Sequence, residues 1–281
     1  MSLREGLGNV SDAFRFHASV SGGMTWRFLY LAVYYAVFLL CRRGDRHARP
    51  LRWLKRLGLS DRLIRVVLPD GGRMKLDLHG AFDPLYQVYA ARDYCLPPGF
   101  EPRPGQVVVD VGANVGTYAL RMARLVGAAG RVAAIEPHPA NHALLSDSAR
   151  ENGFHWLTAV QAAVSDAPGR AKLYIHPRAI NYSLVRGSGE CVEVDVTTLD
   201  ALVERLGLPK IDILKVDVEG SEPAVLRGAR GILERQRPLL AFERDDPGQA
   251  AETEEVLRTV RYRWRDIGAI RYAWPAESGP A

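Results

Sequence analysis

The sequence predicts an α/β protein whose central sheet is mostly parallel and doubly wound. Three observations support this prediction. From residue 106 on, short apolar runs alternate with segments whose apolar residues recur at helical spacing. The first run, 106–111, reads QVVVDV and leads directly into a glycine-containing turn, as expected for a strand buried on both faces. The last runs, on either side of Gly268, predict a closing antiparallel hairpin.

The expected elements follow one another in a regular order after residue 105. Each apolar run predicts a strand, and each amphipathic segment predicts the helix that crosses to the next strand. The expected strands cover 106–111, 131–136, 157–164, 211–216 and 239–243. The expected helices cover 117–126, 141–152, 198–206, 222–235 and about 249–258. Runs at 171–175 and 191–196 predict an antiparallel excursion, and runs at 261–264 and 269–273 predict the closing hairpin.

Residues 1–104 form a predicted N-terminal extension, and residues 105–281 form the predicted main domain. Two short alternating runs flank the turn signal PDGG at 69–72, which predicts a small hairpin. Residues 81–95 are expected to be helical. Prolines and glycines between 97 and 105 then predict a loop at the domain boundary.

The N-terminal extension is basic and contains one long apolar run. Residues 1–75 hold 14 Lys and Arg against 5 Asp and Glu, whereas the remaining residues hold 23 against 27. Residues 28–41 are 14 uncharged, aromatic-rich residues between Arg27 and Arg42. A helix of this length spans roughly 21 Å, less than the roughly 30 Å of a bilayer core. Two interpretations remain open: the segment 24–46 contacts an anionic membrane surface peripherally, or its helix packs on the main domain or on a second copy of the chain in a homo-oligomer.

The composition narrows the compartment and the partners. The three cysteines, Cys41, Cys95 and Cys191, form no close pair, which argues against a zinc site and a disulfide framework. A reduced cytoplasm is therefore the expected location, with the peripheral membrane contact left open. The sequence has no RNA-binding signature and no zinc-finger spacing, so we expect no nucleic-acid partner.

The turn after the first expected strand carries the strongest functional signal. Residues 110–116 read DVGANVG. Gly112 and Gly116 allow a tight turn and a close approach of the backbone to a ligand, and the next helix directs its N-terminal N–H groups there. Dinucleotide-binding loops use G-x-G-x-x-G, whereas here Gly116 follows Gly112 by four positions and Asn114 stands between them. A methionine-derived cofactor needs an acceptor for its amino group, which Asp110 can supply.

Acidic residues also follow the second and third expected strands. Glu136 ends the second strand, where a carboxylate can accept both hydroxyls of a ribose. The alternative is that Glu136 caps the next helix. Asp166 follows the third strand, where it can accept a proton from an adenine amino group. The alternative is a plain turn residue before Pro168.

A second polar motif lies at the end of the fourth expected strand, where residues 214–222 read LKVDVEGSE. Ligands of open α/β sheets bind at the carboxyl ends of strands, so Asp217 and Glu219 are expected beside the first loop. Two carboxylates there can orient a sulfonium group, accept a hydroxyl proton or hold a divalent cation; we assign no metal. Glu222 is expected to open the next helix, where its charge suits the helix dipole.

Several motifs, taken together and in this order, resemble the FkbM-type methyltransferases of the class I fold. The motifs are DVGANVG at 110–116, EP at 136–137, AVSD at 163–166, TLD at 198–200 and KVDVEGSE at 215–222. The resemblance covers about 105–243, and the first 60 residues match nothing in it. It implies a seven-stranded, Rossmann-like class I sheet, S-adenosyl-L-methionine as cofactor, and usually an oxygen acceptor on a sugar, polyketide or similar natural product.

The resemblance also implies which residues face the cofactor. The cofactor-binding positions fall on Asp110, Gly112, Asn114, Gly116, Glu136, Ser165 and Asp166. The resemblance does not identify the catalytic residue, so Asp217 and Glu219 are candidates by position only.

The sequence therefore predicts an S-adenosylmethionine-dependent O-methyltransferase that acts on a hydroxyl of a sugar, a polyketide or another natural-product or lipid-linked acceptor. One alternative is an NAD-dependent oxidoreductase, against which the glycine spacing and Asn114 argue. The other is a non-enzymatic, membrane-associated protein with a degenerate methyltransferase fold. The intact loop and its carboxylates argue against that alternative, because a degenerate site has no need of them.

Overall fold

The computed structural model describes residues 63–77, 87–175, 182–183, 191–244 and 247–278, together with Arg56 and Leu85. The apolar run 28–41 and the whole segment 24–46 lie outside these residues, so both interpretations of that segment stay predictions. Within the described residues, no helix combines the length and the apolar character that a membrane crossing needs. The described residues belong to two compact units, one up to Arg92 and one from Asp93 on.

The first unit contains the predicted hairpin. Strands β1 (Leu63–Val67) and β2 (Arg73–Asp77) pair antiparallel, in a register that places Val67 opposite Arg73. The carboxylate of Asp70 accepts a hydrogen bond from the backbone N–H of Gly72 at 2.9 Å, which holds the turn.

The helix predicted at 81–95 is only partly present among the described residues. They form one turn of π-helix, η1 (Gln87–Ala91), and residues 92–95 are not helical. The φ angles of Arg92 and Tyr94 are 57° and 70°, which lie in the left-handed region and end a right-handed helix. The prediction is therefore wrong from residue 92 on.

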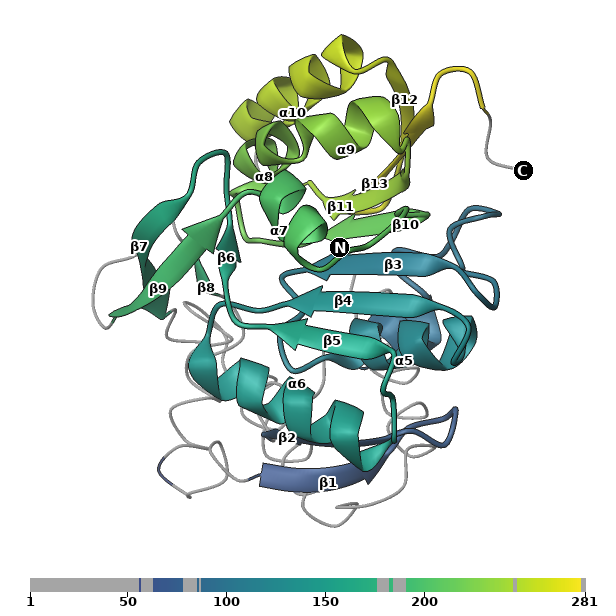
Figure 1. The fold of residues 1–281 in the computed structure, drawn as a ribbon, viewed down its shortest axis with the longest axis vertical. Helices are drawn as coiled ribbons and strands as arrows, with labels where there is room; N and C mark the ends of the chain where they lie inside the picture. Colours follow the sequence, from purple (N-terminus) through teal and green to yellow (C-terminus); the bar gives the residue numbers. More distant parts are fainter. Residues whose placement is uncertain are drawn as a thin grey trace, which may run out of the picture. The chain divides into compact units, whose positions relative to one another are not determined.

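The second unit is built on a seven-stranded sheet with the order β12-β13-β11-β10-β3-β4-β5 (Figure 1). Neighbouring strands run parallel from β11 through β5, and β13 pairs antiparallel with both β11 and β12. This arrangement confirms the predicted mixed sheet with its closing hairpin. The strands are β3 (Val107–Val111), β4 (Arg131–Ile135), β5 (Leu157–Val160), β10 (Ile213–Val216), β11 (Leu239–Glu243), β12 (Tyr262–Ile267) and β13 (Ile270–Pro275).

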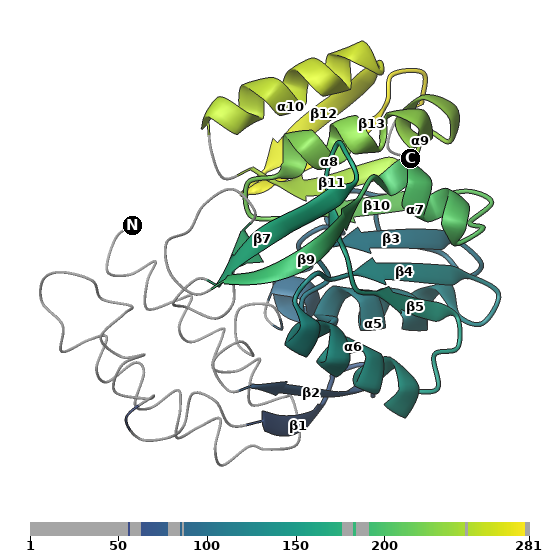
Figure 2. The same cartoon turned by 60° about the vertical axis from the view of Figure 1, so that its left-hand side comes forward.

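Helices connect these strands and bury the sheet. Every residue of β3 and of β10 is buried, as the continuous apolar runs predict. Helices α5 and α6 gather near β4 and β5, whereas α8, α9 and α10 gather near β11 to β13 (Figures 1 and 2). The helices are α5 (Thr117–Val126), α6 (Pro139–Glu151), α7 (Leu199–Arg205), α8 (Glu222–Gly228), α9 (Arg230–Arg235) and α10 (Pro247–Thr259).

The helix predicted at 222–235 is two helices, because the chain breaks at Ala229. The two carboxylate oxygens of Asp200 accept hydrogen bonds from the backbone N–H groups of Gly231 and Ile232, each at 2.8 Å. Asp200 thus satisfies the unpaired donors of a new helix start, which stabilises α9 as a separate element.

The third predicted strand, 157–164, is also divided. It contains β5 and a two-residue strand, β6 (Ala163–Val164), which belongs to a second sheet with the order β6-β9-β7-β8. Strands β7 (Gly169–Ile175) and β9 (Cys191–Thr197) pair antiparallel and form the predicted excursion (Figure 2), to which β8 (Tyr182–Ser183) adds a short edge.

Candidate functional site

The carboxyl ends of β3, β4, β10 and β11 lie at one edge of the main sheet, because these four strands run parallel. Polar residues and glycines follow each strand at this edge. They are Gly112 after β3, Glu136 after β4, Asp217 after β10 and Glu243 at the end of β11. The structure therefore brings together the residues that follow β3, β4 and β10, as predicted, and adds Glu243.

The two glycines of the β3–α5 loop make room for protein atoms. Gly112 has a φ of 79°, and a Cβ atom there would lie 1.8 Å from the backbone oxygen of Asp217. Gly116 has a φ of 94°, and a Cβ atom there would lie 2.5 Å from the side chain of Leu145 in α6. Only glycine combines these φ values with such close contacts. The two glycines thus allow the loop to pack closely against the end of β10 and against α6.

Asn114 and Glu136 are brought together directly. The backbone N–H of Asn114 donates to Oε2 of Glu136 at 2.8 Å, and the N–H of His138 donates to Oε1 at 2.9 Å. The side chain of Asn141 donates to Oδ1 of Asn114 at 2.9 Å. This contact holds Asn114, whose φ of 52° lies in the left-handed region. Glu136 therefore also holds the backbone of His138, the residue before α6, although α6 has no side-chain cap of the kind that the alternative interpretation expected.

Burial changes the acidity of Glu136. Its side chain is only 4% exposed, and this burial raises the pKa of Glu136 to about 7. The hydrogen bonds from His138 and Asn114 act in the opposite direction, because they stabilise the ionised form. Glu136 is thus close to the midpoint between its two protonation states at neutral pH.

Asp110 is fully buried and paired with a protein ammonium group. Nζ of Lys215 lies 3.0 Å from Oδ1 of Asp110 and 3.3 Å from Oδ2 of Asp217, and it donates to the backbone oxygen of Gly112 at 2.9 Å. Burial lowers the pKa of Lys215, but the two carboxylates outweigh burial and raise it above its ordinary value. That Asp110 accepts a ligand's amino group stays a prediction; in the structure its carboxylate has a partner within the protein.

A group of three partly buried carboxylates lies at the ends of β10 and β11. One carboxylate oxygen each of Asp217, Glu219 and Glu243 lies within 4.8 Å of the other two. We call this group the carboxylate cluster. Its oxygens can accept protons or hydrogen bonds, and oxygen ligands of this kind also suit a divalent cation. The two predicted catalytic candidates are therefore together, with a third carboxylate beside them.

The loop that carries Asp217 and Glu219 is held by Glu222. As predicted, Glu222 is the first residue of α8. Its Oε1 accepts hydrogen bonds from the backbone N–H groups of Val218 at 3.1 Å and Gly220 at 3.4 Å. Glu219 has a φ of 52° between these two residues. The carboxylate of Glu222 thus stabilises the turn that presents Glu219.

Ser165 and Asp166 lie directly after β6, between the strands β6 and β7 of the second sheet. Oδ2 of Asp166 lies 3.1 Å from Nε of Arg227 in α8, and Oγ of Ser165 donates to Oδ1 of Asp166 at 3.3 Å. The hydrogen bond from Arg227 lowers the pKa of Asp166, which is exposed and ionised. These contacts connect Asp166 to α8, and its predicted role at an adenine ring stays a prediction.

Three residues of the site were missed by sequence reasoning. Lys215 had a signal, since it is the single charged residue of the buried strand β10. Glu243 also had a signal, because it ends a strand as Glu136 does. Tyr94 had none: its hydroxyl donates to Oδ2 of Asp217 at 3.1 Å across 123 residues of sequence.

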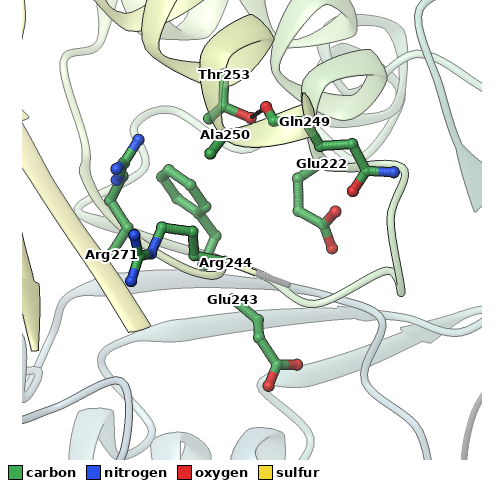
Figure 3. Close-up of a pocket in the computed structure, with 8 residues that line it drawn as sticks. Glu222, Glu243, Arg244, Gln249, Ala250, Thr253 and Arg271 are labelled. Atoms are coloured by element: carbon green, nitrogen blue, oxygen red, sulfur yellow. Dashed lines mark hydrogen bonds between the residues drawn. The ribbon is translucent and has the colours of Figure 1, made fainter. Parts of the chain in front are cut away.

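A small pocket adjoins the carboxylate cluster (Figure 3). Glu243 belongs to both. The pocket wall carries acidic side chains from α8 and β11, basic side chains from β13 and from the residue after β11, and uncharged side chains from α10. Oγ1 of Thr253 donates to the backbone oxygen of Gln249 at 2.8 Å and fixes the α10 side of the wall. The lining residues are Glu222, Phe242, Glu243, Arg244, Gln249, Ala250, Thr253 and Arg271.

Comparison with known proteins connects this geometry to one family. The model of the methyltransferase FkbM domain matches residues 110–264. The chain is 31% identical over 237 residues to the 31-O-demethyl-FK506 methyltransferase FkbM of Streptomyces tacrolimicus, covering 71% of this chain and 89% of that protein. It is 28% identical over 134 residues to the hexuronic acid methyltransferase AglP of Haloferax volcanii, covering 48% of this chain and 54% of that protein.

Among solved structures, methyltransferase FkbM from Methylobacillus flagellatus KT matches with a TM-score of 0.47 and 21% identity. The match covers 68% of this chain and 50% of that one. The chain thus spans most of the Streptomyces relative, but only about half of AglP and of the Methylobacillus protein.

Proposed function

Because the chain belongs to the FkbM methyltransferase family, we propose that it transfers the methyl group of S-adenosylmethionine to a hydroxyl oxygen of a small acceptor. The acceptor class is a sugar, a polyketide or another natural-product or lipid-linked molecule. The observation that carries this proposal is the carboxylate cluster beside the β3–α5 loop. The name of the Streptomyces relative, a 31-O-demethyl-FK506 methyltransferase, supports transfer to oxygen.

The residues present fit S-adenosylmethionine. Each oxygen of Glu136 accepts one backbone hydrogen bond, and a carboxylate offers about four acceptor positions. Glu136 therefore retains the capacity to accept the two ribose hydroxyls. S-adenosylmethionine contains no phosphate, so the loop beside Glu136 does not need the longer glycine spacing of a dinucleotide-binding loop. Ser165 and Asp166 are proposed for the adenine side.

The cofactor supplies a methyl group that its positive sulfur already activates. The remaining work of the chain is to align the acceptor and to take the hydroxyl proton as the new bond forms. Oδ2 of Asp217 is engaged by Lys215 and Tyr94. This support fixes Asp217, so we assign to it the orientation of the reacting groups. We assign proton acceptance to the other two carboxylates of the cluster, Glu219 or Glu243, because they lie beside it.

Family membership favours methyl transfer over the oxidoreductase alternative, and a binding experiment tests both. Isothermal titration of the protein with S-adenosylmethionine, S-adenosylhomocysteine and NAD is expected to show micromolar binding of the two adenosyl ligands only. Glu136→Gln should weaken both at least tenfold, because an amide accepts fewer hydrogen bonds than a carboxylate. Glu255→Gln, on an exposed position of α10, is the matched control and should leave both affinities unchanged.

The outcomes are distinct. Adenosyl binding that the Glu136 variant loses supports the cofactor site. Absence of adenosyl binding would remove the proposal, and binding of NAD instead would point to hydride transfer. With binding established, release of S-adenosylhomocysteine in the presence of hydroxylated sugars and polyketides identifies the acceptor class.

A further inference from the structure

The carboxylate of Asp217 is held unevenly. Both of its partners among the described residues contact Oδ2: the hydroxyl of Tyr94 at 3.1 Å and Nζ of Lys215 at 3.3 Å. No described residue donates a hydrogen bond to Oδ1. A carboxylate that is fixed through one oxygen cannot rotate freely, so its other oxygen points in a defined direction.

Tyr94 occupies a costly conformation to make this contact. Its φ of 70° is in the left-handed region, which is unfavourable for a bulky residue because its Cβ approaches the backbone too closely. The surrounding packing maintains it: the ring meets that of Tyr118 edge-on at 5.8 Å, and Nζ of Lys215 lies 5.3 Å from the ring centroid. Backbone strain that is retained in this way is common at functional sites.

The hydroxyl of Tyr94 is a permanent donor. The side chain is 5% exposed, and burial raises the pKa of Tyr94 well above its ordinary value. The negative charges of Asp217 and Glu243 raise it further. The phenol therefore keeps its proton throughout the neutral range, and its hydrogen bond to Asp217 is always directed the same way.

Lys215, the second partner of Asp217, is also held in place by several contacts. Its ammonium group lies among Asp110, Asp217 and the backbone oxygen of Gly112, so all three of its donors have acceptors nearby. Asp110 in turn is fully buried on β3. Lys215 thus connects the ends of two neighbouring strands and gives Oδ2 of Asp217 a fixed position.

We propose that Tyr94 and Lys215 are positioning residues: by holding Oδ2 of Asp217, they present Oδ1 to the positive sulfur of bound S-adenosylmethionine. This inference rests on the proposed function. Charge that is placed before the ligand arrives need not reorganise, which makes its interaction with a sulfonium stronger. S-adenosylhomocysteine lacks that charge, so comparing the two ligands isolates the contribution of Asp217.

The variant Tyr94→Phe tests the proposal, because it removes the donor and keeps the ring. We expect the dissociation constant for S-adenosylmethionine to rise about threefold to tenfold, as for the loss of one hydrogen bond to a charged group. The dissociation constant for S-adenosylhomocysteine should change less than twofold. Asp217→Asn removes the charge itself and should reduce the preference for S-adenosylmethionine at least as much.

Tyr262→Phe is the matched control. The hydroxyl of Tyr262 donates to the backbone oxygen of Pro238 at 3.0 Å, and it is likewise buried. This variant should lose a similar amount of thermal stability while both affinities stay unchanged. If Tyr94→Phe alters the two affinities by the same factor, or alters neither, the positioning role is overturned. Wild-type protein that binds neither ligand would instead end the proposed function itself.

Discussion

The carboxylates beside β3 and β4 and those beside β10 and β11 lie at the same edge of the sheet, yet their surroundings differ. Asp110 is fully buried and Glu136 nearly so, and both have partners within the protein. The carboxylate cluster is only partly buried. Burial without a compensating partner is costly for a charge, so the fold depends more on the first pair, whereas the cluster is more open to solvent and to a ligand.

This difference shows that two acidic motifs of equal prominence in a sequence can serve different ends. Asp110 forms an ion pair with Lys215, and Lys215 in turn connects the ends of β3 and β10. Glu136 accepts a hydrogen bond from the backbone just before α6, and its oxygens can still accept hydrogen bonds from a ligand. The cluster carries the charge that reacting groups would meet. Stability measurements and binding measurements should therefore separate the two regions.

The largest effect is expected at Asp110. Asp110→Asn leaves the buried ammonium of Lys215 with one carboxylate fewer, and breaking a buried ion pair costs about 3–5 kcal/mol. Urea unfolding measures the loss. Glu219→Gln, in the cluster, should cost less than about 1 kcal/mol. The double variant Asp110→Asn with Lys215→Met should recover part of the stability, because the fully buried ammonium group is gone, although Asp217 also loses its ion pair. Equal losses at Asp110 and Glu219 would erase the distinction between the two regions.

An intermediate effect is expected from the acidity of Glu136. Its pKa of about 7 lies above that of an ordinary glutamate, so the ligand-free protein holds a proton there below that pH. Ribose hydroxyls favour the ionised form. Affinity for S-adenosylhomocysteine should therefore be full above pH 7 and fall as the pH drops below it, by at most about tenfold per unit.

Titration calorimetry in buffers of different ionisation enthalpy should detect proton release on binding near pH 6. Glu136→Gln should bind weakly and show no such dependence. Wild-type affinity that is constant between pH 5.5 and 8 would indicate that Glu136 does not meet the ligand.

The smallest effect is expected at the exposed pair of Asp166 and Arg227. Surface ion pairs contribute roughly 0–1 kcal/mol, so Asp166→Asn should lower the free energy of unfolding by about 0.5 kcal/mol or less. A drop in affinity for S-adenosylhomocysteine, without a matching loss of stability, would place Asp166 at the adenine ring. Unchanged affinity would leave it only a surface contact with α8.

The hydrophobic pattern of the sequence predicted the main sheet well. Strands buried on both faces must be continuously apolar, and crossover helices must be amphipathic, so β3, β10 and α5 follow from local sequence. The rule that the carboxyl ends of parallel strands meet at one edge of the sheet then placed Glu136 and Asp217 together. Contacts between distant segments were not predictable in this way. The break at Ala229 depends on Asp200, and the support of Asp217 depends on Tyr94.

The packing of Gly228 has a consequence for engineering. A Cβ atom at Gly228 would lie 2.1 Å from the backbone oxygen of Ser165 and 3.3 Å from Cα of Asp166. The backbone of α8 therefore lies directly against the segment proposed for the adenine side. Libraries that randomise Ser165 and Asp166 but leave α8 unchanged would vary the side chains while contact with α8 keeps the backbone in place. A change of cofactor preference that needs this segment to shift would have to be selected in both places at once.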